Sequence, residues 1–259
     1  SPLSVAPSLP AEVRAAAAAE SARGGTSVRA NEVRRPTKFP NRTHGKAFFT
    51  IPGQGDFVCS ASVVRSPSRS LVWTAGHCVY DRGFVRRWVF VPAYRNGKRP
   101  YGVWPARKLA STPQWKRSSA LKYDLGAARV AKRGGGGDIQ RRTGARGIAF
   151  NRDVPQRLDA FGYPAESNTQ TNQDFDGQRP YRCDSRAKGR ENPPGRGPKT
   201  IRIGCDMTAG ASGGGWVNAR GLVLSVSSYV RERGTNTELY GPYMGEIAKD
   251  LYQRMAKRG

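Results

Sequence analysis

The sequence predicts an all-β protein, a sandwich or a barrel, that ends in one α-helix. Short apolar runs rich in Val, Ile, Phe and Trp recur from Lys46 onward. Breaks rich in Gly and Pro, such as RGGGGD and NPPGRGP, separate these runs. A helical period appears only in the last segment. With 259 residues, the chain can form one large domain or two tightly joined halves.

The first 42 residues differ in composition from the rest. They contain several prolines and an alanine run at 15–19, but few large apolar side chains. Such a segment cannot bury enough surface to offset the entropy lost on ordering it. We expect residues 1–42 to form a flexible extension or the remnant of a pro-segment, with a short helix around 11–22.

The expected strands fall into two groups. The first group is KAFFTI, FVCSASVV, LVWTAG, WVFVPAY and LGAARVA, and the second is RLDAFGYP, KTIRIGC, GGWVNA and LVLSVSSYV. Turn-rich segments lie between the two groups and within the second group. The longest of them, 165–198, is polar, and we expect it to be a surface loop held by Cys183. In the final segment, 246–259, Ile247, Leu251 and Met255 recur every four residues and predict an amphipathic helix.

The cysteines indicate an oxidising environment. Cys59, Cys78, Cys183 and Cys205 form no CxxC pair, and His44 lies far from any ligand spacing, so we expect no metal site and no cofactor. Of the three connectivities that four cysteines allow, short loops favour Cys59–Cys78 with Cys183–Cys205. Because disulfides persist outside the cytosol, we expect a secreted, extracellular protein.

The net charge of +25 favours acidic partners, because a basic surface attracts polyanions over long distances. The basic residues are scattered, however, and no nucleic-acid motif is present, so non-specific polyanion contact is expected rather than specific nucleic-acid binding. No apolar run approaches the roughly 18 residues of a membrane span. The start of the chain has no signal-peptide pattern, which is typical of a mature or trimmed form. We expect a monomer.

One glycine-rich stretch, TAGASGGGW, places Ser212 at the centre of a tight turn. An ordinary serine would fit such a turn, and so would a nucleophile. A nucleophilic serine needs a base to take its proton, and only His77 and His44 are available as histidine bases. The base in turn needs an orienting carboxylate.

Asp124 is the favoured carboxylate because it directly precedes an apolar strand and can lie at the rim of the core. Asp81 is too near His77 in the sequence for an easy approach, and Asp138 lies in a glycine-rich loop. The remaining alternatives are Asp153 and Asp159.

Three blocks, TAGHC, YDLG and GASGGGW, resemble the signature blocks of chymotrypsin-like (trypsin-like) serine proteases, in the order histidine, aspartate, serine. FVCSASVV resembles the strand whose cysteine bridges to the one after the catalytic histidine, which supports the Cys59–Cys78 pair. FGYP and CDMTAGASGG are similar to the bacterial branch that includes glutamyl endopeptidases. The resemblance covers residues 44–259.

The resemblance implies two six-stranded antiparallel β-barrels, at 43–150 and 151–245, followed by the helix. It also implies a serine endopeptidase that cleaves protein or peptide substrates through His77, Asp124 and Ser212, with an oxyanion hole formed by the N–H groups of Gly210 and Ser212. The alternative is a catalytically weak, basic protein of the protease fold that binds polyanions or cell-surface partners.

The sequence departs from the trypsin pattern at two positions. Ala211 stands where trypsin carries the aspartate that pairs with a new N-terminus, which leaves the role of residues 1–42 open, and Gly215 stands where proline is usual.

Specificity is less clear from the sequence. Asp206 lies six residues before Ser212, the spacing at which trypsin carries its pocket aspartate. Cys205 is displaced relative to the trypsin pattern, so the loops differ, and Asp206 is either a pocket charge or a loop residue. Thr208 and the strand 225–229, in particular Ser225 and Ser227, are the expected pocket walls. Because no histidine follows His77, strict glutamyl specificity is not expected.

Overall fold

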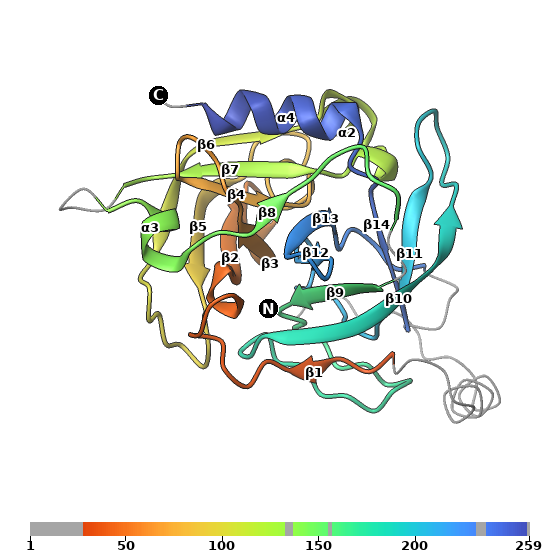
Figure 1. Cartoon of the computed structure of the whole chain (residues 1–259), viewed down its shortest axis with the longest axis horizontal. Helices are drawn as coiled ribbons and strands as arrows, with labels where there is room; N and C mark the ends of the chain where they lie inside the picture. Colours follow the sequence, from red (N-terminus) through yellow and green to blue (C-terminus); the bar gives the residue numbers. More distant parts are fainter. Residues whose placement is uncertain (1–27, 133–136, 155–156, 232–236, 258–259) are drawn as a thin grey trace.

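The first half of the chain closes into a six-stranded barrel. The computed structural model describes residues 28–132, 137–154, 157–231 and 237–257. Neighbouring strands around the barrel follow the order β2-β3-β4-β7-β6-β5 (Figure 1). Their bounds are β2 His44–Ile51, β3 Gly55–Val63, β4 Leu71–Thr74, β5 Arg86–Pro92, β6 Trp104–Ser111 and β7 Gly126–Val130.

The second half forms an eight-stranded sheet in the order β14-β11-β10-β9-β12-β13-β8, with β1 paired to β10. Strand pairing does not close this sheet into a second barrel, although an isolated bridge between Tyr229 and Tyr240 joins the chain after β13 to β14. The predicted all-β class is confirmed. The bounds are β1 Asn31–Glu32, β8 Gly147–Ile148, β9 Arg157–Gly162, β10 Tyr181–Glu191, β11 Thr200–Gly204, β12 Gly215–Val217, β13 Leu222–Val226 and β14 Glu238–Gly241.

The C-terminal helix α4 (Glu246–Ala256) confirms the helical pattern of the last segment. It buries Ala248, Leu251 and Met255 and lies along β7 and β6 of the barrel (Figure 1). The shorter helices are α2 (Pro113–Ser118), α3 (Ile139–Thr143), and the 3-10 turns η1 (Asn41–Thr43) and η2 (Leu121–Tyr123). None of the helices among the described residues is long and apolar enough to cross a membrane.

Strand β10 corrects the expectation that 165–198 is a surface loop. Its first six residues, 181–186, pair with β9, and its remaining residues pair with β11 across a register shift between Ala187 and Gly189. Tyr181, Cys183 and Ser185 are buried, whereas the residues between them are more exposed, so one face of the strand is buried. Because few of its residues are large and apolar, the sequence does not show the alternation of apolar and polar residues that is typical of such a strand.

Residues 28–42 correct the expectation of an extension without packing contacts. Asn31 and Glu32 pair with β10, which places β1 alongside that strand (Figure 1). Ala30 and Val33 are buried. The backbone hydrogen bonds between β1 and β10 and the buried side chains of Ala30 and Val33 therefore hold this part of the chain in place. Residues 1–27, with the helix expected at 11–22, lie outside the described residues.

The disulfides join Cys59 to Cys78 and Cys183 to Cys205, the pairing that short loops favour. Cys59 lies in β3, and its bridge holds the segment after β4 against the barrel. Cys183 lies in β10, and Cys205 directly follows β11. Each bridge thus fixes a segment that also carries side chains of the candidate site.

Candidate active site

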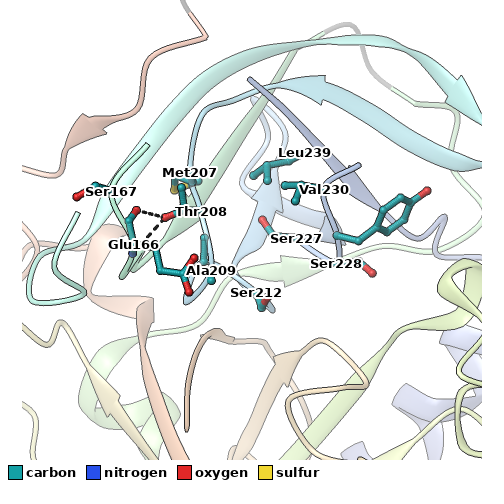
Figure 2. Close-up of a pocket in the computed structure, with 12 residues that line it drawn as sticks. Glu166, Ser167, Met207, Thr208, Ala209, Ser212, Ser227, Ser228, Val230 and Leu239 are labelled. Carbon is teal, nitrogen blue, oxygen red and sulfur yellow. Dashed lines mark hydrogen bonds between the residues drawn. The ribbon is translucent and has the colours of Figure 1, made fainter. Parts of the chain in front are cut away.

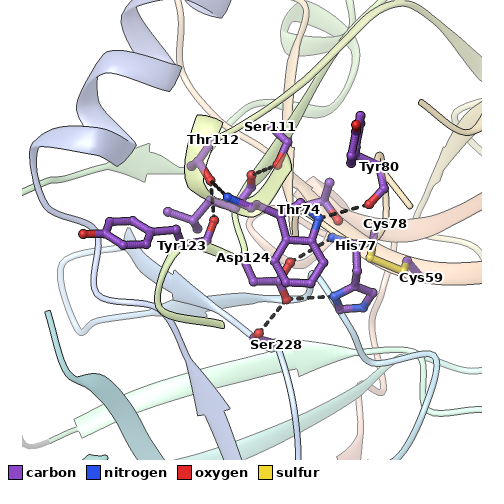
Figure 3. Close-up of polar contacts among 12 residues, drawn as sticks. Cys59, Thr74, His77, Cys78, Tyr80, Ser111, Thr112, Tyr123, Asp124 and Ser228 are labelled. Carbon is purple, nitrogen blue, oxygen red and sulfur yellow. Dashed lines mark hydrogen bonds and ion pairs between the residues drawn. A yellow bond between two sulfur atoms is a disulfide. The ribbon is translucent and has the colours of Figure 1, made fainter. Parts of the chain in front are cut away.

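His77 and Asp124 form a two-point contact at the edge of the barrel. The ring nitrogen Nδ1 of His77 lies 2.8 Å from Oδ2 of Asp124, and the backbone N–H of His77 donates to Oδ1 over 2.8 Å (Figure 3). Asp124 ends η2 just before β7 and is fully buried. The carboxylate therefore fixes both the position and the ring orientation of this histidine.

Two neighbours shape the space around the Asp124 carboxylate. Ser228, which lies beyond β13 in the second half, donates its hydroxyl to Oδ2 over 2.5 Å. Gly76 leaves room for the carboxylate, because a Cβ at this position would lie 2.8 Å from Oδ1 and from the Trp115 ring. Figure 3 shows Asp124 between His77 and Ser228. The sequence places Ser228 in the expected pocket wall 225–229, but nothing local marks its hydroxyl as the partner of Asp124.

The pKa of His77 reflects two opposed effects. Burial disfavours the imidazolium and lowers the pKa, whereas the charge of Asp124 and its hydrogen bond to the ring raise it. Burial is the largest single effect, but the two effects of Asp124 together outweigh it, and the pKa is raised above its ordinary value of 6.5. In the neutral ring, the N–H group at Nδ1 donates a hydrogen bond to the Asp124 carboxylate. The other nitrogen, Nε2, then carries a lone pair.

The turn that carries Ser212 is fixed to strands of the first half. The N–H of Ser60 in β3 donates to the carbonyl oxygen of Ser212 over 2.7 Å, and its hydroxyl donates to the carbonyl oxygen of Gly210 over 2.8 Å. The carbonyl oxygen of Ser60 accepts from Thr74, three residues before His77, over 2.8 Å. Ser60 therefore connects the serine turn to the segment that carries the histidine.

Gly210 has a left-handed backbone, with φ of +90°. A Cβ at Gly210 would lie 2.5 Å from the carbonyl oxygen of Tyr163, so only glycine fits without a shift of the backbone. The glycines predicted to allow a tight turn are thus required by both dihedral angle and space.

A pocket of about 270 Å³ opens beside Ser212 (Figure 2). Of the expected wall residues, Thr208, Ser227, Ser228 and Tyr229 line it. Glu166 also lines it, which no motif predicts, because Glu166 precedes the serine turn by more than forty residues. The lining residues are Glu166, Ser167, Met207, Thr208, Ala209, Ala211, Ser212, Ser227, Ser228, Tyr229, Val230 and Leu239.

Asp206 and Ser225, the other expected pocket residues, do not line this pocket. Asp206 is fully buried, and its Oδ1 accepts the N–H of Ala30 over 2.7 Å while Oδ2 accepts from Gln173 over 2.8 Å. Ser225 is also fully buried and donates to the carbonyl oxygen of Pro242 over 2.8 Å. Both side chains satisfy neighbouring structural groups, which favours the loop-residue alternative for Asp206 and leaves Ser225 outside the pocket wall.

His44, the other candidate base, is enclosed between the two halves. Its ring stacks on Phe161 at 3.9 Å, accepts from Nε of Arg146 at Nε2 over 3.2 Å, and lies 2.8 Å from the hydroxyl of Ser62 through Nδ1. Burial, followed by the charge of Arg146, lowers its pKa well below 6.5. With both nitrogens engaged, His44 has no lone pair for a substrate.

The other carboxylates considered for the histidine have different partners. Asp81 accepts from Gln54 over 2.8 Å, Asp138 caps α3 through the N–H of Arg141 and pairs with Arg69, and Asp159 lies 3.8 Å from Arg182. No described contact brings Asp153 to His77. Asp124 is therefore the carboxylate that holds this histidine.

One group of three metal-ligating residue types lies close together in the described part of the chain: Cys59, His77 and Cys78. Both sulfurs are joined in a disulfide, so neither is the thiolate that a metal would bind.

Comparison with known proteins places this geometry in a family. The profile of the family described as Trypsin matches residues 37–246. A thermostable serine protease, AL20, from an extremophilic microorganism is 36% identical, with 83% of this chain and 97% of that chain covered and a TM-score of 0.73. Protease Anisep from Arthrobacter nicotinovorans is 33% identical, with 85% and 98% covered and a TM-score of 0.73.

A glutamyl endopeptidase shares the fold at 16% identity, with 88% of this chain and 97% of that chain covered and a TM-score of 0.68. No curated protein matches the chain. The family match spans both halves and includes His77, Asp124 and Ser212. The chain therefore belongs to the trypsin family of serine proteases.

Proposed function

We propose that this chain is a secreted serine endopeptidase that cleaves peptide bonds through an acyl-enzyme. The hydroxyl oxygen of Ser212 attacks the scissile carbonyl carbon, and Nε2 of His77 accepts the hydroxyl proton. The proton then passes to the leaving amine as the C–N bond breaks. Water repeats the sequence on the acyl-enzyme, which releases the carboxylate product and restores Ser212.

The observation that carries the proposal is the double contact between His77 and Asp124. One carboxylate oxygen holds the ring and the other holds the backbone of the same residue, each over 2.8 Å. This arrangement supports the tautomer in which Nε2 is the proton acceptor. It also stabilises the imidazolium that forms when Ser212 loses its proton.

Two backbone groups support an oxyanion hole. Among the hydrogen bonds of the described residues, none has the N–H of Gly210 or of Ser212 as its donor. These N–H groups therefore remain available to the negative oxygen of the tetrahedral intermediate. In serine proteases each such donor lowers the barrier by roughly 3 kcal/mol.

Secretion is part of the proposal because two disulfides need an oxidising compartment to persist. We propose that the protein acts as a monomer on protein or peptide substrates, without a cofactor. Its charge of +25 adds non-specific attraction to polyanions such as anionic cell surfaces.

The test is labelling by a fluorophosphonate probe, followed by sequencing of the labelled peptide. We expect one label, on Ser212, and peptide hydrolysis that falls by several orders of magnitude in Ser212→Ala with an unchanged circular dichroism spectrum. Labelling elsewhere, or near-full activity of Ser212→Ala, would refute the assignment.

The competing function, a catalytically weak binding protein, draws support from the net charge alone. It predicts no labelling of Ser212. It also predicts polyanion binding that weakens steeply as salt rises, measured by affinity at two or more salt concentrations.

A further inference from the structure

We infer that the pocket beside Ser212 accepts an uncharged, apolar side chain from the residue on the acyl side of the scissile bond. This inference rests on the proposed endopeptidase function. It concerns the class of substrate, which family membership leaves open, because proteases of one fold differ in the chemistry of this pocket.

The inner wall of the pocket is apolar. Met207 and Leu239 line it and are almost fully buried, while Val230 stands at its edge with 41% of its surface exposed. Figure 2 shows Leu239 and Val230 close to one another on the side away from Glu166. Apolar side chains on these walls gain from excluding water against a substrate methyl or methylene group.

Three hydroxyl groups of the pocket already have protein partners. Thr208 donates to the carbonyl oxygen of Glu166, Ser228 donates to Asp124, and Ser227 accepts from the indole of Trp216 over 3.0 Å. A charged substrate side chain buried here would lose its water and gain few hydrogen bonds. Such burial is unfavourable unless a partner charge is present.

Asp206 stands at the spacing of trypsin's pocket aspartate, but its carboxylate does not supply a charge to this pocket. Both oxygens of Asp206 are occupied, one by the N–H of Ala30 and one by the amide of Gln173, and the side chain is fully buried outside the pocket lining. The carboxylate stabilises the segment that leads into β1. It is therefore unavailable to a substrate lysine or arginine.

Glu166 is the single carboxylate among the residues that line the pocket. It is exposed, and in Figure 2 it lies on the Thr208 side of the pocket, opposite Leu239. Water screens the charge of an exposed carboxylate, so its attraction for a substrate cation is weak. The apolar wall, not Glu166, is expected to decide the preference.

The experiment is a series of peptides that differ only in the residue before the scissile bond, with Leu, Met, Val, Phe, Arg, Lys or Glu at that position. Active enzyme is counted by fluorophosphonate titration. We expect kcat/KM for the best of the Leu, Met and Val peptides to exceed that for Arg and Lys by tenfold or more. A preference for Arg, Lys or Glu would overturn the inference.

Two variants locate the cause of the preference. Glu166→Gln should leave the ratio of Leu to Arg cleavage within threefold of the original protein, and a collapse of Arg cleavage would show that the rim carboxylate binds substrate. Asp206→Asn should also leave this ratio unchanged, even where it lowers the melting temperature. A chain that fails to react with the fluorophosphonate refutes the proposed function, whereas a labelled chain that prefers Arg refutes only the pocket inference.

Discussion

The hydroxyl of Ser228 donates to Oδ2 of Asp124, the same carboxylate oxygen that contacts the ring of His77. Ser228 follows strand β13 in the second half of the chain, and Asp124 belongs to the first half. This hydrogen bond therefore makes the orientation of the histidine depend on both halves of the molecule.

Ser228→Ala should lower kcat by about tenfold or more, because a hydrogen bond to a charged group contributes roughly 1.5–3 kcal/mol. The measurement is steady-state hydrolysis of a peptide substrate. Ser118→Ala is a matched control, since this exposed hydroxyl contacts only its own helix turn, and it should retain full activity. Equal rates for the two variants would show that the Ser228 contact does not position the carboxylate.

Asp124→Asn should lower kcat by about 10⁴, the magnitude known for the same change in a serine protease triad. The amide can donate to the ring and so favours the tautomer in which Nε2 carries the proton. Binding of a substrate-like inhibitor should change little, because Asp124 does not line the pocket. A loss of less than tenfold in kcat would exclude Asp124 as the orienting carboxylate.

The acid limb of kcat/KM should have its midpoint above pH 6.5, because the reaction needs neutral His77 and its pKa is raised. For stability the sign is opposite: a raised pKa stabilises the fold below pH 6.5, and the contribution is lost as the pH rises through the folded-state pKa. Asp124→Asn should move the midpoint to lower pH. A midpoint below 6.5 in the original protein would contradict the prediction.

Removing either disulfide should lower the free energy of unfolding by roughly 3 kcal/mol, because each closes a loop of similar length. The two double variants should differ in activity. Cys59→Ser with Cys78→Ser loosens the neighbours of Ser60 and His77 and should reduce kcat. Cys183→Ser with Cys205→Ser loosens the segment that leads to Thr208 in the pocket and should reduce kcat less. Denaturant unfolding and kinetics on the same samples test both statements.

A chain that begins at Thr43 should be less stable than one that begins at Val28, by at least about 2 kcal/mol. It loses the strand pair between β1 and β10 and leaves an oxygen of buried Asp206 without its N–H donor. The measurement is unfolding by urea. Equal stability would show that residues 28–42 are peripheral. A tenfold rise in turnover on removing them would instead reveal an inhibitory segment.

The sequence alone could predict the parts of the site that lie in short, continuous motifs. His77 and Ser212 each stand within a stretch of fixed local geometry, and Cys59–Cys78 spans a short loop, so their surroundings are largely local. Strand β10 was missed because its outward-facing residues are charged, and its pairing with β9 and β11 is a tertiary effect.

The direction of a side chain was the harder property to predict. Asp206 has the spacing of a pocket charge, but its carboxylate is directed by a backbone N–H at Ala30, 176 positions away in the chain. Ser228 lies 104 positions from Asp124, and Glu166 lies 42 positions from Thr208. Distances of this kind leave no periodic or local pattern.

The contacts of Ser60 bear on the order in which the site is completed while the chain is being synthesised. This residue of the first barrel holds the backbone of both Gly210 and Ser212, which are translated about 150 positions later. A chain whose first half alone has folded therefore lacks both the Ser228 contact that helps to orient Asp124 and His77 and an ordered serine turn. If the proposed function holds, peptidase activity should appear only after the second half has docked, so a partly synthesised chain would be unable to digest itself or its neighbours.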